Sequence, residues 1–365
     1  MMINIPDNIK ELKTYKVGKS NDELMAEFGL SKVLNLGSNE NQLGASPKGL
    51  KSMSESFSGI EFYPDGSCIG VRQKIASKFG LGVENISVGN GSEGMINYIY
   101  KAFFRGDDEM LTFNGSFIGV YIAAKSADMN CRLLDLKADY SFDLDLLLEE
   151  INENTRAVYL ANPNNPTGTI FSKEEFKSFM EKVPENIIVV LDEAYIEFAL
   201  HLDDDFLVGH KEQYENLIIL RSFSKAFGLA GIRIAYGIAS KEITEALLKV
   251  KLTFEPSAVA QAAGYGAIDD DEFIEAVVRN NKIGLEYYYK ELKKLNIKFT
   301  KSYGNFVMVE FETENEVNKI NQFLLSKGVV VRPLKAFGLE KCIRISIGRP
   351  EQNEYVVKQL NKYFN

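Results

Sequence analysis

Short apolar runs alternate with longer helix-patterned stretches through the middle of the chain. The runs cover residues 86–88, 109–113, 156–161, 187–191, 217–220 and 233–238. After the first run, an apolar stripe at helical spacing is formed by Met95, Ile96, Ile99, Ala102 and Phe103. Strands that alternate with helices predict a mostly parallel sheet with helices on both faces.

The pattern changes after about residue 250. A helical stretch at 271–295 precedes runs of alternating polarity at 305–311, 329–331 and 342–347, which predict a separate antiparallel sheet. In the last run Ile343, Ile345 and Ile347 share one face, so Arg344 points away from the core of that sheet. We therefore expect an α/β chain with a large parallel-sheet domain over 31–250. A smaller α+β domain would combine 1–30 with 251–365.

Composition narrows the classes of partner and compartment. Lys and Arg number 42 against 51 Asp and Glu, a net charge of −9, which repels nucleic acid and anionic membranes. No apolar run has the roughly 18 residues that span a bilayer, and the first ten residues lack the layout of a secretion signal. Cys68, Cys131 and Cys342 show no metal-site or disulfide spacing. We expect a cytoplasmic protein without a bound metal.

Histidine is scarce, which bears on any catalytic chemistry. The two histidines, His201 and His210, flank an acidic stretch that is typical of a solvated loop. If the protein is an enzyme, its general base is expected to be another residue type.

Polar residues follow four of the apolar runs. The four segments are Gly89-Asn90-Gly91-Ser92-Glu93-Gly94, Asn162-Pro163-Asn164-Asn165-Pro166-Thr167-Gly168, Asp192-Glu193-Ala194-Tyr195 and Arg221-Ser222-Phe223-Ser224-Lys225. In a parallel α/β sheet, ligands bind beyond the carboxyl ends of the strands. The four segments are therefore expected to meet at one edge of the sheet.

The first segment contains glycines at the spacing of a dinucleotide-binding turn, Gly89, Gly91 and Gly94. A nicotinamide dehydrogenase would also need an acidic residue after the next strand to hold the ribose, but that run ends in Asn114. A glycine-rich turn before a helix can instead present N–H groups and the helix dipole to a phosphate. An ordinary tight turn is the remaining interpretation.

Asp192 and Lys225 are the two candidates for catalysis. A carboxylate that closes a buried strand needs a cation or strong donor, and a protonated pyridine nitrogen is one such partner. Asp192 could equally cap the following helix. Lys225 lies among apolar residues with Arg221 and Arg233 close in sequence, which would lower the pKa of its amine and make it nucleophilic. Most lysines on loops are simply solvated.

Taken together, these segments resemble the fold-type I pyridoxal-phosphate aminotransferases, and within them most closely the histidinol-phosphate aminotransferases. The resemblance rests on residues 162–168, 192–195 and 221–233. It extends to Leu36-Gly37-Ser38-Asn39-Glu40-Asn41, Phe62-Tyr63-Pro64-Asp65-Gly66, Val331-Arg332-Pro333 and Ile343-Arg344-Ile345-Ser346-Ile347-Gly348. It covers nearly the whole chain, and its motifs are more specific for the cofactor than for the substrate.

The resemblance implies a cofactor site for pyridoxal 5′-phosphate. Lys225 would carry it as a Schiff base, Asp192 would pair with the pyridine nitrogen, and Asn165 and Tyr195 would bond the phenolic oxygen. Lys225, Asp192 and Tyr195 would be the catalytic residues. The phosphate would be held by Ser92 and Glu93, through the turn and the start of the helix, together with Ser222, Ser224 and Arg233.

Two aromatic residues complete the implied cofactor site. Phe117 would stack on the ring, although its segment is one residue longer than the family pattern. Tyr63 would reach the phosphate of the neighbouring subunit, which implies a homodimer with shared active sites.

The same resemblance also implies which residues bind the substrate. Arg344 would bind the substrate carboxylate, with Asn165 beside it, and Arg332 with Tyr15 would bind the distal anion. Surface charge is the plainer interpretation of both arginines. Gln42 and Tyr355 depart from the family pattern, where proline and, in some members, arginine stand. These departures leave room for a smaller phosphorylated substrate than an imidazole alcohol phosphate.

The leading hypothesis is transamination between an amino acid, such as glutamate, and a small phosphorylated keto compound. A decarboxylase of O-phospho amino acids would need the same cofactor residues. Two further hypotheses lie outside this cofactor class: a nicotinamide dehydrogenase built around Gly89, Gly91 and Gly94, and a non-catalytic binding domain.

Overall fold

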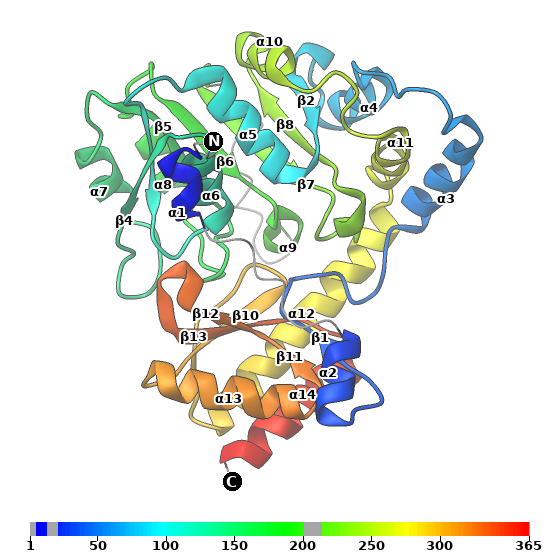
Figure 1. Cartoon of the computed structure of the whole chain (residues 1–365), viewed down its shortest axis with the longest axis vertical. Coiled ribbons are helices and arrows are strands. Elements are labelled where there is room, and N and C mark those ends of the chain that lie inside the picture. Colours follow the sequence, from blue (N-terminus) through cyan, green and yellow to red (C-terminus); the bar gives the residue numbers. More distant parts are fainter. Residues whose placement is uncertain (1–4, 13–20, 201–213, 365) are drawn as a thin grey trace.

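A seven-stranded sheet forms the centre of the larger part of the molecule (Figure 1). The computed structural model describes residues 5–12, 21–200 and 214–364. The strands are β2 (Ile86–Gly89), β3 (Glu109–Phe113), β4 (Asn130–Leu134), β5 (Thr155–Ala161), β6 (Ile188–Asp192), β7 (Leu217–Ser222) and β8 (Ala235–Ala239). Their order is β2-β8-β7-β6-β5-β3-β4, and only β8 runs antiparallel to its neighbours. The prediction of a mostly parallel sheet is confirmed.

Helices cover both faces of this sheet. They are α3 (Pro47–Glu55), α4 (Ile69–Phe79), α5 (Gly91–Phe103), α6 (Ile118–Ser126), α7 (Leu144–Glu149), α8 (Lys173–Met180), α9 (Ile196–Leu200), α10 (Lys241–Val250) and α11 (Ala258–Ala267). One apolar core joins α4, α7, α8 and α11 to the sheet, and a second joins α5, α6 and α10 to its other face. Val158 and Tyr159 of β5 enter different cores because successive side chains alternate across a strand. Met95, Ile96 and Ile99 are buried in the second core, as the stripe predicts.

The smaller part contains an antiparallel sheet of order β12-β13-β10-β9. Its strands are β9 (Lys298–Phe299), β10 (Phe306–Glu310), β12 (Arg332–Leu334) and β13 (Leu339–Ser346), and its helices include α13 (Glu314–Ser326) and α14 (Pro350–Phe364). Ile343, Ile345 and Ile347 lie in the core of this part, so the predicted face of β13 is confirmed. The prediction of a strand at 329–331 is confirmed, but its assignment to the antiparallel sheet is wrong. This run forms β11 (Val329–Val330), which pairs in parallel with β1 (Leu34–Asn35) in a separate two-stranded sheet.

Three segments connect the two parts across the expected limits of the domains. Helix α12 (Asp271–Lys294) runs between them (Figure 1), and its residues enter two different apolar clusters. Helix α11, beyond residue 250, lies against α3 and α4 of the larger part. Strand β1, before residue 250, pairs with β11 of the smaller part. The exact division of the chain into domains stays a prediction.

The remaining short elements lie at the N-terminus and in turns. They are α1 (Asp7–Glu11), α2 (Asn21–Phe28), η1 (Ser56–Gly59), η2 (Val83–Asn85), η4 (Ala230–Ile232) and η5 (Lys335–Phe337). Within the described ranges, none of the helices combines the length and apolar character needed to cross a bilayer.

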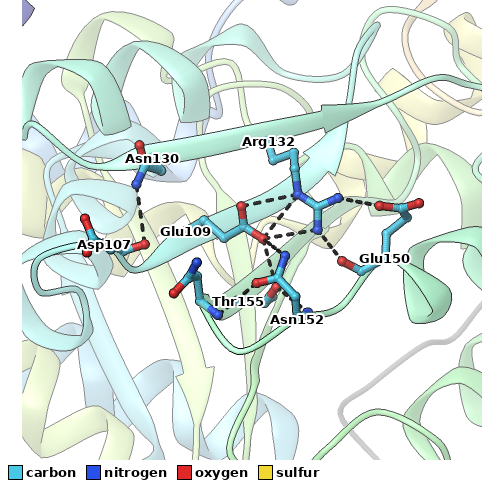
Figure 2. A network of polar contacts seen from close by, with 8 residues as sticks. Asp107, Glu109, Asn130, Arg132, Glu150, Asn152 and Thr155 are labelled. Atoms are coloured by element: carbon cyan, nitrogen blue, oxygen red, sulfur yellow. Dashed lines mark hydrogen bonds and ion pairs between the residues drawn. The ribbon is translucent and has the colours of Figure 1, made fainter.

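A polar network ties three parallel strands together at their amino ends (Figure 2). Glu109, the first residue of β3, accepts hydrogen bonds from Arg132, Asn152 and Thr155. Arg132 of β4 also binds Glu150. Because the strands are parallel, this network lies at the sheet edge opposite to the one where the polar segments gather.

Candidate active site

The predicted polar segments meet at the carboxyl-end edge of the central sheet. Strands β5, β6 and β7 are parallel neighbours, and β2 runs in the same direction because both β2 and β7 are antiparallel to β8. Ala235 at the start of β8 pairs with Gly89 on one side and Ser222 on the other. Arg233, just before β8, therefore reaches the same edge as Asp192 and Lys225.

The start of α5 and Arg233 form a positively charged cup. Gly91 opens the helix with φ +76°, and a Cβ on it would lie 2.6 Å from Nη2 of Arg233. Ser92 follows in the first turn, where free backbone N–H groups and the helix dipole favour an anion. Arg233 donates to the Ala230 carbonyl at 3.1 Å and lies 3.5 Å from the exposed Glu93 carboxylate. Glu93 thus contacts the arginine of the cup.

The segment after β7 carries two buried serines and the lysine. Ser222 is 4% and Ser224 is 6% exposed, and the Ser224 N–H donates to Oγ of Ser222 at 3.1 Å. This bond turns the chain directly after the strand. Lys225 is half-buried, and its Nζ donates to the Ser38 carbonyl at 3.3 Å. The amine therefore lies between the large sheet and the segment that follows β1.

Asp192, the last residue of β6, is a buried carboxylate without an ion-pair partner among the described residues. It is 5% exposed and accepts hydrogen bonds from the Tyr159 hydroxyl at 2.6 Å and the Ala194 N–H at 3.0 Å. Burial raises the pKa of Asp192, although Tyr159, Ala194 and the charge of Lys225 act to lower it. A cationic group in the site would stabilise the ionised carboxylate.

Tyr195 and Asn165 approach the same space from two loops. Tyr195 is 4% exposed, its ring meets Phe306 edge-on at 5.4 Å, and its hydroxyl accepts from Nδ2 of Asn39 at 2.9 Å. Asn165 is buried, and its Oδ1 accepts a hydrogen bond from Nη1 of Arg344. Loops of the larger part and strand β13 of the smaller part therefore share the site.

Arg344 and Arg332 form a pair of cations with no carboxylate partner in the described part of the chain. They lie opposite each other on β13 and β12. Arg344 is 5% exposed, donates to the Gly37 carbonyl at 2.8 Å, and lies over the Phe306 ring at 5.4 Å. Burial lowers the pKa of Arg344 to about 10, and the charge of Arg332 acts in the same direction. Two uncompensated guanidinium groups favour an anionic ligand.

For three predicted site residues, the described contacts show no link to the side chains of the site. Phe117 is the N-cap of α6 and lies against the second core of the large sheet. Its turn is tied to the site loop, because Asn164 donates to the Gly115 carbonyl at 3.0 Å. Tyr63 is 80% exposed and stacks on Phe254 at 4.3 Å. Tyr15 lies outside the described residues, as do both histidines.

Sequence reasoning missed two residues that contact the site and misjudged a third. Tyr159 binds Asp192, but it stands inside an apolar strand where no motif marks it. Asn39 was part of a recognised segment but had no assigned contact. Arg221 was expected to influence Lys225, yet its guanidinium binds Glu193 at 2.7 Å, so its charge is balanced. Because successive side chains of a strand point to opposite faces of the sheet, Arg221 and Ser222 of β7 lie on different faces.

This fold and this site define an aminotransferase: the chain belongs to the family of class I and II aminotransferases, whose model matches residues 31–360. Among curated relatives, histidinol-phosphate aminotransferase of Geobacillus sp. (strain WCH70) is 36% identical over 360 residues, 99% of this chain and 98% of the relative. Histidinol-phosphate aminotransferase 2 of Pasteurella multocida (strain Pm70) is 38% identical over 361 residues, 98% and 97% of the two chains. The predicted resemblance is confirmed.

Solved structures agree with this membership. The crystal structure of histidinol-phosphate aminotransferase from Sinorhizobium meliloti in complex with pyridoxal-5′-phosphate matches with a TM-score of 0.89 and 26% identity, covering 100% of this chain and 98% of that one. Aspartate aminotransferase from Thermotoga maritima matches with a TM-score of 0.86 and 20% identity, covering 99% and 100%, which shows the fold alone. The fold-type I expectation is confirmed, and the family assignment disfavours a nicotinamide dehydrogenase.

Proposed function

We propose that this protein is a pyridoxal-phosphate-dependent aminotransferase that moves an amino group between an amino acid, such as glutamate, and a small phosphorylated keto compound. The observation that carries the proposal is Asp192, a buried carboxylate without a cationic partner in the described structure, placed at the same sheet edge as Lys225 and the cup at α5. The family and its histidinol-phosphate aminotransferase members support the same activity.

The residues present fit this cofactor. The phosphate of the cofactor would be bound by the first turn of α5 and by Ser92, Ser222, Ser224 and Arg233. Gly91 leaves room for the guanidinium of Arg233 in this phosphate site, because any larger residue at position 91 would displace that group. A protonated ring nitrogen would supply the cation that Asp192 lacks, and Tyr195 and Asn165 would bond the oxygen of the ring.

Each side chain then has a distinct task. Bound pyridoxal phosphate supplies an electron sink for negative charge at the substrate carbon. Lys225 would hold the cofactor through its amine and, once free, would move a proton at the substrate carbon. Asp192 would keep the ring nitrogen protonated. Arg344 binds the substrate carboxylate in a buried position, where its two-pronged donors fix the orientation of the substrate.

The distal end of the substrate is assigned to Arg332, with Tyr15 as a predicted helper. Arg332 lies next to Arg344 across two strands and is less buried. A ligand with two separated anionic groups matches such a pair. We therefore propose a phosphorylated keto compound for one half of the reaction and a dicarboxylic amino acid for the other.

We also propose that two copies of the chain form a homodimer with shared sites. Exposed apolar side chains lie on two segments that the stacked rings of Tyr63 and Phe254 bring together, 57–69 and 252–254: Phe57, Ile60, Phe62, Ile69, Leu252 and Phe254. Apolar side chains grouped in this way favour an interface. Tyr63, which stacks on Phe254, would reach the phosphate of the partner subunit.

A reducing compartment, the cytoplasm, is the proposed location. Cys68 and Cys342 are buried, Cys131 is half-buried, and all three are free. Unpaired cysteines are typical of proteins that work where thiols stay reduced.

Reconstitution tests the proposed function. We expect the apoprotein to gain a visible absorption band with pyridoxal phosphate, and borohydride to fix the cofactor on the peptide that contains Lys225. Lys225→Ala should keep some affinity through the phosphate cup but lose the band and turnover. A colourless protein, or a fully active Lys225→Ala variant, would contradict the proposal.

The reaction class is tested on the loaded wild-type protein. Under transamination, glutamate should bleach the visible band and yield its keto acid, and a phosphorylated ketone should restore the band. Release of carbon dioxide from a phospho amino acid, with no keto acid consumed, would assign the decarboxylase instead.

A further inference from the structure

Three consecutive residues after β1 contact four residues of the proposed site. The Gly37 carbonyl accepts from Arg344 and Arg332, and the Ser38 carbonyl accepts from Lys225. The Asn39 side chain donates to the Tyr195 hydroxyl. From this geometry we infer that Asn39 is a positioning residue: its amide fixes the direction in which Tyr195 donates its proton. The inference deepens the proposed function and rests on it.

Asn39 is held in a conformation that costs free energy. Its φ is +55°, in the left-handed region, and it is 1% exposed. Among non-glycine residues, asparagine and aspartate adopt this region most readily. Two residues of the smaller part hold it there, because its N–H donates to Oγ of Ser346 at 2.9 Å and its carbonyl accepts from Asn305 at 3.1 Å. Strained residues held in this manner cluster at functional sites.

The buried hydroxyl of Ser346 fixes which way the Asn39 amide faces. Oγ of Ser346 accepts from the Asn39 N–H at 2.9 Å and donates its proton to Oδ1 of Asn39 at 3.0 Å. Ser346 is fully buried, so with the amide turned the other way this proton would have no acceptor among the described residues. Oδ1 therefore faces Ser346, and the NH₂ group donates to Tyr195.

A phenolic hydroxyl has one proton to give. Because the Tyr195 oxygen accepts from Asn39, its proton points elsewhere, and no acceptor for it occurs among the described residues. Tyr195 is thereby left as a donor to an oxygen of the bound cofactor. A donor at that oxygen stabilises its negative charge. It therefore lowers the pKa of the nearby protonated nitrogen through which Lys225 would hold the cofactor.

The same segment links this donor to substrate binding. Ser346 stands two residues after Arg344 on β13, and the Gly37 carbonyl accepts directly from Arg344. The strand that binds the substrate carboxylate and the hydroxyl that tunes the cofactor are thus joined through Gly37, Ser38 and Asn39.

The experiment is a spectroscopic pH titration of the loaded protein. Asn39→Gly keeps the left-handed backbone but removes the amide. We expect the midpoint of the pH-dependent visible band to rise by about half to one pH unit, the size of one lost hydrogen bond. Asn39→Asp should raise the midpoint further, because its carboxylate accepts the Tyr195 proton and diverts it from the cofactor.

A double-mutant comparison and a matched control make the test specific. In a Tyr195→Phe background, Asn39→Gly should cause no further shift, because the hydroxyl it orients is gone. Asn296→Gly, at an exposed position with the same φ of +55°, should leave the midpoint unchanged. An unmoved midpoint in Asn39→Gly, or an equal shift with and without the Tyr195 hydroxyl, would overturn the inference. Failure of the proposed function would look different, since the wild-type protein would then show no band at all.

Discussion

At the scale of single residues, the charge of Asp192 is separable from its shape. Replacing it by asparagine keeps the side-chain volume but removes the negative charge. We expect Asp192→Asn to lower kcat by about 100- to 1,000-fold, since a lost buried ion pair costs about 3–4 kcal/mol of barrier. Single-turnover kinetics with glutamate would measure this, with thermal unfolding as the check on folding. Wild-type turnover in a folded variant would show that the carboxylate has no electronic role.

Glu197 gives the molecule a pH-dependent stability. The residue is partly exposed, but its Oε2 atom is buried without a hydrogen-bond partner among the described residues. Burial raises the pKa of Glu197 to about 7, against the lowering effect of Arg221. The folded state therefore binds more protons than the unfolded chain between the ordinary pKa of 4.5 and 7, and stability falls as pH rises through this window.

The variant Glu197→Gln removes this titration. Its free energy of unfolding, relative to wild type, should rise by about 2–3 kcal/mol between pH 4 and pH 8. Urea unfolding at the two pH values measures the difference. Glu174→Gln, at an exposed position on the first turn of α8, is the matched control. Parallel pH profiles for Glu197→Gln and wild type would contradict the assignment.

Motifs in the sequence predict roles for Lys225, Asp192 and Arg344, because each chemistry needs a characteristic residue in a characteristic place. The contact of Asn39 with Tyr195 could not be found in the same way. It joins residues 156 positions apart, and only the folding of β1 against the smaller part brings the amide to the hydroxyl. The partner of Arg221 was hidden for a related reason, since the sequence does not show which face of β7 meets Glu193.

At the scale of elements, the start of α5 depends on a glycine. Gly91 combines a φ of +76° with a Cβ position 2.6 Å from Arg233. Gly91→Ala should weaken pyridoxal phosphate binding by about 10-fold or more, because left-handed alanine costs about 1–2 kcal/mol and the methyl group displaces the guanidinium. Equilibrium dialysis measures the Kd.

Gly106 provides the control for backbone strain. It also has a positive φ, +52°, but open space around its Cβ position. Gly106→Ala should therefore destabilise the fold without changing the Kd for the cofactor. Equal Kd values for both variants and wild type would remove Gly91 from the phosphate site.

Strands with continuous apolar runs were predicted to within one or two residues, because both faces of a central strand are buried. Strand β4 was missed: it is an edge strand, with exposed and half-buried residues, so its apolar signal is weak. Strand β11 was placed in the wrong sheet. Two apolar residues cannot specify a partner, and its partner β1 lies at the other end of the chain.

At the scale of the whole molecule, segments that the sequence pattern assigns to a single domain in fact contact both parts. Helix α12 contributes Val278 to a cluster with Tyr195 and Leu285 to the core of the smaller part. The Gly37–Asn39 segment contacts both parts as well. Composition and periodicity describe each part by itself, whereas the site exists only where the parts meet.

The proposed shared site can be tested only in the assembled dimer. If Tyr63 serves the partner subunit, a mixed dimer of Lys225→Ala and Tyr63→Ala chains contains one site with both defects and one site with none. At limiting pyridoxal phosphate, where the loss of Tyr63 weakens binding, the purified mixed dimer should recover about half the wild-type activity. Two affinity tags allow its isolation, and each parent dimer gives the background. If Tyr63 instead served its own subunit, every site of the mixed dimer would carry one defect, and activity would not exceed the mean of the two parents.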